Sequence, residues 1–307
     1  MHAHSHPQAH HAHGDHADPG RAFAVGIALN VAFVAVELVF GVLANSLSLI
    51  ADATHNFSDV LGLALAWGAA TLARKPPSTR FTYGLRGSTI LVALGNAMLL
   101  LVATGGIGWE AILRLRDPGA VNEITMIWVA LAGALVNGLT AWSFRTGRKS
   151  DLNVRGAYLH MAADAGVSLG VAAAGAGMLL TGWRWLDPAA SLAIVATIFV
   201  STWGLLRDSL KLALHAAPES IDPAGVRLFL AGLPGVSEVH DLHIWAMSTT
   251  ETALTVHLVM PAGHPGDEFF AQLAHQIEAR FRIGHATIQI ETGTSSKACT
   301  LAPDHVV

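Results

Sequence analysis

Three long stretches of this chain contain no Asp, Glu, Lys or Arg: Gly87–Trp109, Ile124–Phe144 and Pro188–Leu206. They run for 23, 21 and 19 residues, and a helix needs about 20 mostly apolar residues to cross a bilayer. Only 13% of the 307 residues are charged, whereas soluble domains average about 25%. These runs predict a multi-pass membrane protein and argue against an ordinary soluble enzyme.

Three further apolar runs carry ionisable residues. Ala22–Leu43 contains Glu37, while Ser48–Ala73 and Leu152–Gly182 each contain acids and a histidine. All six runs are long enough to span a membrane. Together they predict a bundle of six transmembrane helices.

Loop charges predict how the chain is oriented, because Lys and Arg stay on the cytoplasmic side. The basic residues cluster after the second and fourth runs: Arg74, Lys75, Arg80 and Arg86, then Arg145, Arg148, Lys149 and Arg155. Both termini are therefore expected in the cytoplasm, and the Ala- and Gly-rich composition favours a bacterial inner membrane. The net charge of −4 argues against a nucleic-acid partner.

The pattern changes after Leu214, where short alternating segments replace the long apolar runs. Helices are predicted from Pro223 to about Ala231, behind the capping residue Asp222, and over Pro265–Arg282. Strands are predicted over Val236–Ser248, Glu251–Met260 and His285–Glu291. The order predicts a small two-layer α+β domain. The expected domains are a tail at 1–20, the six-helix domain at 21–214, the small domain at 215–293 and a tail at 294–307.

Two of the predicted spans contain the same pair of residues, histidine followed four positions later by aspartate. The pairs are His55 with Asp59 and His160 with Asp164, and residues four apart share one helix face. Asp59 lies about 21 Å and Asp164 about 18 Å from the cytoplasmic end of its helix. Because the two helices are antiparallel, each histidine comes level with the other helix's carboxylate. Four ligands are therefore expected to converge.

Two imidazoles and two carboxylates form the kind of tetrahedral set that binds Zn²⁺. The two negative charges balance a divalent cation, and protons compete for the same groups when the cation is absent. That competition is what an exchanger requires. Interhelical hydrogen bonds that only hold the bundle together are the alternative interpretation. Asp52, one turn before His55 near the outer mouth, is either an entry relay or a solvated acid.

Several motifs resemble the cation diffusion facilitators. They are Asp52-Ala-Thr-His55-Asn-Phe-Ser-Asp59, Arg80-Phe-Thr-Tyr-Gly84-Leu-Arg86, His160-Met-Ala-Ala-Asp164 and Val239-His240-Asp241-Leu242-His243-Ile-Trp245. The resemblance runs from about Arg21 to Glu291. It implies a homodimer of six-helix subunits with a ferredoxin-like cytoplasmic domain. It also implies export of Zn²⁺, sometimes Cd²⁺ or Co²⁺, in exchange for protons through His55, Asp59, His160 and Asp164.

The resemblance further implies a regulatory zinc site in the small domain, at His240 and His257 with Glu291 as the acidic ligand. Some members of the family have a histidine ligand at the position of Gln289. Cys299 or His305 in the tail is a substitute for that missing ligand. His243 and His264 are weaker candidates for metal ligands. Read from the residues alone, His240 shares a strand face with Leu242 and Ile244, so a buried core histidine is the alternative. Since Cys299 is the only cysteine, a disulfide within the chain is excluded.

Seven histidines fall within the first sixteen residues: His2, His4, His6, His10, His11, His13 and His16. The segment is too polar to form a core, and metal capture at the cytoplasmic mouth and a tolerated low-complexity tail are both compatible with it.

Two other functions compete with transport. An intramembrane metalloprotease needs a His-Glu-x-x-His motif and an open ligand position, and the sequence has no such motif. A membrane-anchored metal sensor would not need acids at mid-membrane depth. No prosthetic group is expected; Zn²⁺ is expected as the substrate and as a regulatory ion, with protons, the lipid bilayer and a second copy of the chain as the other partners.

Overall fold

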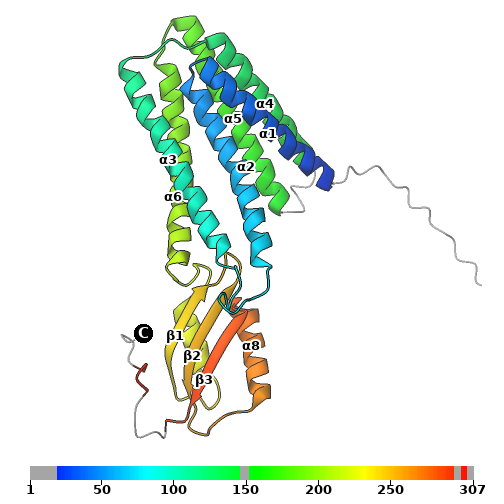
Figure 1. The fold of residues 1–307 in the computed structure, drawn as a ribbon, viewed down its shortest axis with the longest axis vertical. Helices are drawn as coiled ribbons and strands as arrows, with labels where there is room; N and C mark the ends of the chain where they lie inside the picture. The colour runs from blue at the N-terminus through cyan, green and yellow to red at the C-terminus, as the bar shows by residue number, and fades with distance from the viewer. Residues whose placement is uncertain (1–18, 146–151, 294–298, 303–307) are drawn as a thin grey trace, which may run out of the picture. The chain divides into compact units, whose positions relative to one another are not determined.

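The computed structural model describes residues 19–145, 152–293 and 299–302, with side chains from residue 31 onward except at 152 and 153. The seven N-terminal histidines and His305 lie outside these residues. Six long helices come first: α1 (Pro19–Leu43), α2 (Leu47–Ala73), α3 (Ser88–Arg116), α4 (Glu123–Phe144), α5 (Leu152–Thr181) and α6 (Leu186–Ala213) (Figure 1). Each coincides with one of the six apolar runs.

Four of these helices are long and apolar enough to cross a membrane, namely α3, α4, α5 from Val154 onward, and α6. In α1, the part with described side chains includes an apolar stretch at Val31–Leu43. Helix α2 carries Asp52, His55 and Asp59 in its first half and is not one of the four. The chain therefore has a helical membrane domain with four clear apolar spans.

The chain divides into two compact units, residues 1–60 with 106–195 and residues 61–105 with 196–307. Within the first unit, α4 packs against both α1 and α5. The approach is close at Gly133 of α4, where a Cβ atom would lie 2.7 Å from the ring of Phe33 and 3.1 Å from the Ser168 hydroxyl. A glycine at this position lets helices α1, α4 and α5 pack together.

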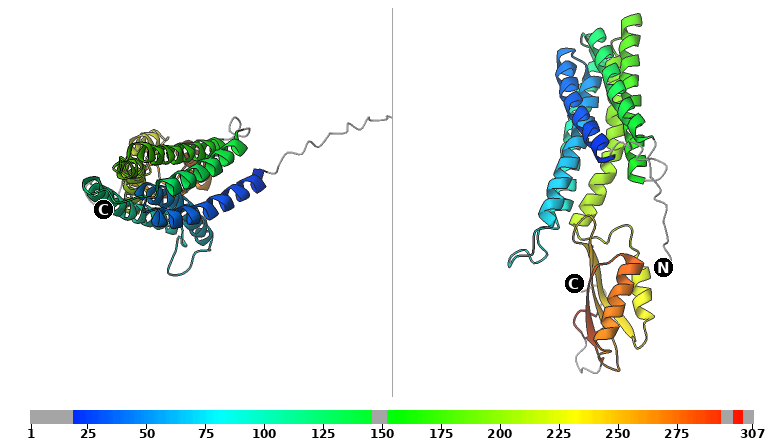
Figure 2. Two further views of the ribbon diagram at one scale, coloured as in Figure 1. Left: turned by 90° about the horizontal axis from the view of Figure 1, so that it is seen from above. Right: turned by 90° about the vertical axis from the view of Figure 1, so that its right-hand side faces the viewer.

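The second unit contains a three-stranded sheet in the order β1-β2-β3, built from Glu238–Ala246, Thr252–Val259 and His285–Glu291. Strands β1 and β2 are antiparallel, and β2 and β3 are parallel. Helices α7 (Pro223–Ala231) and α8 (Asp267–Phe281) lie on one face of the sheet (Figure 2). The element order expected after Leu214 is confirmed, including the Asp222 cap, whose side chain accepts from the backbone N–H of Ala224.

The helix-covered face holds the apolar core of this small domain. Helix residues Val226, Leu230, Leu273 and Ile277 pack there against Leu254, Val256 and Leu258 of β2. Side chains alternate between the two faces of a strand, so His257 of β2 lies on the opposite face. That face carries the polar residues described below.

The expectation that His240 shares a face with Leu242 and Ile244 is wrong. Strand β1 has a bulge between His240 and His243, where Asp241 adopts a left-handed backbone with φ of 51°. A bulge adds one residue and reverses the alternation beyond it. His240 therefore pairs with His257 on the polar face, while Ile244 pairs with Leu254 on the core face.

Candidate metal centres

Helices α2 and α5 bring together the four residues of the two His-x-x-x-Asp pairs. The shortest contact crosses between the helices: His160 Nε2 lies 3.1 Å from Asp59 Oδ2. His55 Nε2 lies 3.7 Å from Asp164 Oδ1 on the other helix, and the two contacts within a helix are 3.8 and 3.6 Å. Each histidine is thus level with the partner helix's carboxylate, as the antiparallel arrangement predicts.

The four side chains differ in how deeply they lie. Asp164 is 3% exposed and His55 23%, whereas Asp59 and His160 are 35% and 43% exposed. Oδ2 of Asp164 and Nδ1 of His55 are buried and form no hydrogen bond within the described part of the chain. Two carboxylates and two imidazoles, whose shortest contacts are with one another, form a set of electron-pair donors that a cation can bind.

Asp52 is fully buried, so the interpretation of a solvated acid at the mouth is wrong. Its Oδ2 accepts a hydrogen bond of 2.9 Å from the Ser168 hydroxyl of α5, and its Oδ1 accepts a longer one of 3.5 Å from Asn56. Asp52 therefore links α2 to α5 one helical turn from the four-residue cluster.

Asp187 is a buried residue that the sequence patterns did not single out. Its carboxylate accepts hydrogen bonds from the hydroxyls of Ser46 and Ser48 and from the backbone N–H groups of Leu47 and Ser48, at 2.6 to 3.1 Å. A carboxylate at the first N–H groups of a helix stabilises its start. Asp187 thus fixes the start of α2. The sequence features that could have pointed to this contact are an acid in the first turn of α6 and the Ser46-Leu47-Ser48 sequence at the start of α2.

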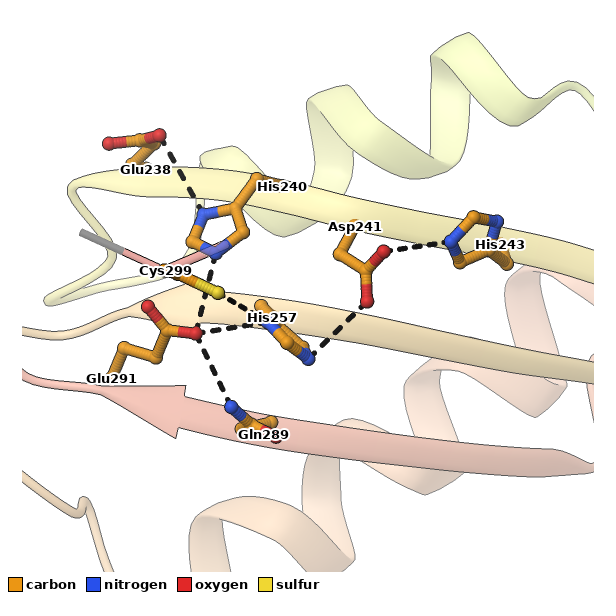
Figure 3. A network of polar contacts seen from close by, with 8 residues as sticks. All are labelled: Glu238, His240, Asp241, His243, His257, Gln289, Glu291 and Cys299. Carbon is orange, nitrogen blue, oxygen red and sulfur yellow. Dashed lines mark hydrogen bonds and ion pairs between the residues drawn. The ribbon is translucent and has the colours of Figure 1, made fainter. Parts of the chain in front are cut away.

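A second cluster lies on the polar face of the small domain, built from His240, His257, Glu291 and Cys299 (Figure 3). One potential ligand atom from each lies within 4.8 Å of all the others. Glu291 Oε1 lies 2.9 Å from His257 Nδ1 and 3.4 Å from His240 Nε2. The Cys299 sulfur lies 3.7 Å from His257 Nδ1.

The surroundings of this second cluster orient its ligands. Asp241 contacts Nε2 of His257 at 3.4 Å and Nε2 of His243 at 2.8 Å. A carboxylate at Nε2 holds the proton there and leaves Nδ1 of His257 free to bind a cation. His243 is therefore a partner of Asp241, and His264 lies against Phe270; neither belongs to the four-residue set.

Burial would raise the pKa of Glu291, but contacts with the Cys299 thiol and with His240 and His257 outweigh it. The net effect lowers the pKa of Glu291 below its ordinary value, so this carboxylate is ionised at neutral pH. The buried ring nitrogens of His240 form no hydrogen bond within residues 19–145, 152–293 and 299–302. Both observations fit a group of ligands prepared for a metal ion.

A helical membrane domain with imidazoles and carboxylates gathered between two helices defines a class, the membrane proteins that handle cations. Family models match almost the whole chain: the cation efflux transmembrane domain matches residues 23–212, and the cation efflux protein cytoplasmic domain matches residues 218–293. The chain belongs to the cation efflux family, the cation diffusion facilitators.

Curated relatives resemble the chain over most of its length. It is 36% identical to the cation efflux system protein CzcD of Alcaligenes sp. (strain CT14) over 94% of this chain and 92% of the relative. The zinc transporter ZitB of Escherichia coli (strain K12) is 36% identical over the same shares. A cadmium, cobalt and zinc/H(+)-K(+) antiporter of Bacillus subtilis (strain 168) is 34% identical over 85% of each chain. The chain is therefore an integral membrane transporter of metal cations and not an enzyme.

Proposed function

We propose that this chain exports Zn²⁺ from the cytoplasm in exchange for protons, through His55, Asp59, His160 and Asp164. Cd²⁺ and Co²⁺ are alternative substrates, because the same ligand set accepts them. The observation that carries the proposal is the convergence of two imidazoles and two carboxylates from opposed helices, with cross-helix contacts of 3.1 and 3.7 Å. The printed names of the relatives, a zinc transporter and a cadmium, cobalt and zinc antiporter, support this choice of substrate.

The charge of the cluster supports exchange rather than permanent binding. Two aspartates and one divalent cation sum to zero, which removes most of the cost of burying the charges. After the cation leaves, the two carboxylates repel each other and favour the uptake of protons. Cation and protons therefore compete for one set of atoms, which is the basis of antiport.

The proposed architecture follows the expected boundaries. A tail occupies 1–20, six membrane-spanning helices occupy 21–214, a ferredoxin-like domain occupies 215–293, and a second tail occupies 294–307. Both termini face the cytoplasm of a bacterial cell, the chain lies in the inner membrane, and two copies form a homodimer. Histidines at positions 2 to 16 capture metal ions at the cytoplasmic side.

Proteoliposomes test the transport proposal directly. Vesicles that contain the wild-type chain should take up Zn²⁺ and move protons in the opposite direction, and the uptake should stop in Asp59→Asn and Asp164→Asn. Asp208→Asn is a matched control, since this exposed acid pairs with its neighbour Arg207 on α6. Normal uptake in both cluster variants, or uptake without proton counterflow, contradicts the proposal.

A second proposed function is metal-dependent regulation at His240, His257, Glu291 and Cys299. The four residues offer two nitrogens, one oxygen and one sulfur, all of which are zinc ligands in proteins. The negative charges of one carboxylate and one thiolate balance the charge of a divalent cation. Both ring nitrogens of the buried His240 lack a hydrogen bond in the described residues. The cluster lies outside the membrane domain, so its ion acts on transport as a regulator and not as cargo.

A further inference from the structure

Helix α4 carries a buried amide that is not one of the four proposed ligands. Asn137 is completely inaccessible, and neither its oxygen Oδ1 nor its nitrogen Nδ2 forms a hydrogen bond with any residue that the structure describes. Burying an amide without a hydrogen-bond partner costs free energy. Polar residues in membrane helices usually offset this cost with a hydrogen bond to a neighbouring helix. Since Asn137 forms no such bond within the described chain, helix packing alone does not account for it.

Two close approaches between α4 and α5 define which residues of these helices face each other. A Cβ atom at Gly175 of α5 would lie 3.5 Å from Cγ of Met126, and one at Gly133 of α4 would lie 3.1 Å from the Ser168 hydroxyl. From the first contact to the second, α4 advances seven residues and α5 goes back seven. Seven residues are about two helical turns, so the contacts lie on one face of each helix. The two helices therefore keep one antiparallel register along this interface.

The same register brings Asn137 level with Asp164. Asn137 lies four residues after Gly133 on α4, and Asp164 lies four residues before Ser168 on α5. Residues four apart share one face of a helix, and both side chains are buried. Oδ2 of Asp164 also forms no hydrogen bond in the part of the chain that the structure describes. An amide N–H without an acceptor and a carboxylate oxygen without a donor therefore lie at one level of the α4–α5 interface.

We propose that Asn137 is a positioning residue of the cation site, whose Nδ2–H donates to Oδ2 of Asp164 when Oδ1 of Asp164 binds the cation. A carboxylate held in this way at one oxygen binds the ion through the other oxygen alone. Four single-atom ligands in a tetrahedron suit Zn²⁺, whereas larger cations take more oxygens and bind carboxylates through both. Asn137 therefore favours Zn²⁺ over the larger Cd²⁺. The inference rests on the proposed transport function and names a residue that determines the specificity of the same site.

Asn137→Leu tests the inference, because leucine has a similar size and lacks both amide groups. In proteoliposomes of the full-length chain, the KM for Zn²⁺ uptake should rise by about 10- to 100-fold, while the inhibition constant of Cd²⁺ as a competitor should change less. The unfolding temperature should stay equal or rise, since an apolar group replaces an unpartnered buried amide. An amide with a purely structural role would give a lower unfolding temperature and an unchanged KM.

Ser191→Ala is the matched control. Ser191 of α6 is also fully buried, and its hydroxyl has no hydrogen-bond partner among the described residues. It lies one helical turn from Asp187, which contacts the start of α2 and not the cation site. Both constants should therefore equal those of wild type in this variant.

An unchanged KM for Zn²⁺ in Asn137→Leu overturns the inference, and so does an equal weakening of Zn²⁺ and Cd²⁺. If Asn137→Leu does not fold, the smaller Asn137→Ala gives the same two constants. Uptake by Asp164→Asn that equals wild-type uptake refutes the proposed function itself. Loss of uptake in Asp164→Asn together with unchanged constants in Asn137→Leu refutes only the role of Asn137, so the two failures are distinguishable.

Discussion

The two candidate metal clusters share a pair of histidines but differ in their other ligands and in the elements that support them. In the membrane cluster, His55 and Asp59 come from one helix and His160 and Asp164 from another, and Nδ1 of His55 has no hydrogen-bond partner in the described chain. The small-domain cluster takes one ligand from each of β1, β2, β3 and the segment after β3. Asp241 contacts Nε2 of His257, the ring nitrogen that faces away from the other ligands. Nδ1 of His55 thus has no partner among the described residues, whereas Nε2 of His257 has a carboxylate beside it.

This difference fits two different tasks. A carboxylate behind a histidine ligand fixes its orientation and raises its affinity for metal, and a thiolate adds a soft ligand that zinc binds strongly. A transporter must release its ion, so an unsupported histidine and hard carboxylates suit the membrane cluster. A regulator must keep its ion as long as the cytoplasmic concentration is high. Under the proposed functions, the membrane cluster turns its ion over and the small-domain cluster retains it.

The largest expected effect concerns Asp164, the most buried ligand of the membrane cluster. Asp164→Ala removes one ligand and half of the negative charge, at a cost of about 3–5 kcal/mol, which corresponds to a loss of at least about 100-fold in cation affinity. Transport in proteoliposomes should fall to background. Metal binding by the small domain of the same variant should stay normal, and a parallel loss there would mean that the two clusters are not independent.

Asp187→Ala should be the next largest effect, through folding rather than chemistry. The hydroxyls of Ser46 and Ser48 still have each other as partners, but the backbone N–H groups of Leu47 and Ser48 lose their acceptor. An unsatisfied buried donor costs about 1–3 kcal/mol. The thermal unfolding temperature of the helical domain should drop clearly in Asp187→Ala and less in Asp187→Asn, whereas the exposed Asp208→Asn should not change it. If all three variants had the same unfolding temperature as wild type, Asp187 would not anchor α2.

The helices and the membrane cluster could be predicted from the sequence because both depend on local periodicity. Uncharged runs define the spans, and a spacing of four residues places His55 beside Asp59 whatever the rest of the chain does. The antiparallel order of α2 and α5 then follows from counting the spans. The ligand roles remain predictions, which the proposed experiments test.

The remaining features depend on contacts between distant segments. Val239-His240-Asp241-Leu242-His243 alternates like a regular strand, and nothing in that pattern reveals that Asp241 adopts a left-handed backbone. The bulge reverses the faces, so the alternative interpretation of His240 as a core histidine is wrong, and His240 lies beside His257. Asp187 meets α2 across 140 residues of chain.

Cys299→Ser tests whether the small-domain cluster holds its ion through sulfur. Zinc affinity should fall by about 100-fold or more, since even an outer hydrogen-bond partner of a ligand is worth 10–100-fold. The Co²⁺-loaded wild-type chain should show a thiolate-to-metal charge-transfer band in the near ultraviolet, and the variant should lose it. Transport through the membrane cluster should persist with altered dependence on zinc concentration. A Co²⁺ spectrum that is identical in both chains rules out Cys299 as a ligand.

The smallest expected effect is that of Asp241→Asn, which tests why the strand cluster retains its ion. Asparagine tolerates the left-handed backbone at this position, so the bulge should survive while the negative charge behind His257 is lost. Zinc affinity at the small-domain cluster should fall by about 10-fold. His243→Ala is the matched control, because it removes the other partner of Asp241 and should leave affinity unchanged. Equal zinc affinity in Asp241→Asn and wild type would show that the carboxylate of Asp241 behind His257 does not distinguish the two clusters. Weaker zinc binding in His243→Ala would make His243 a ligand.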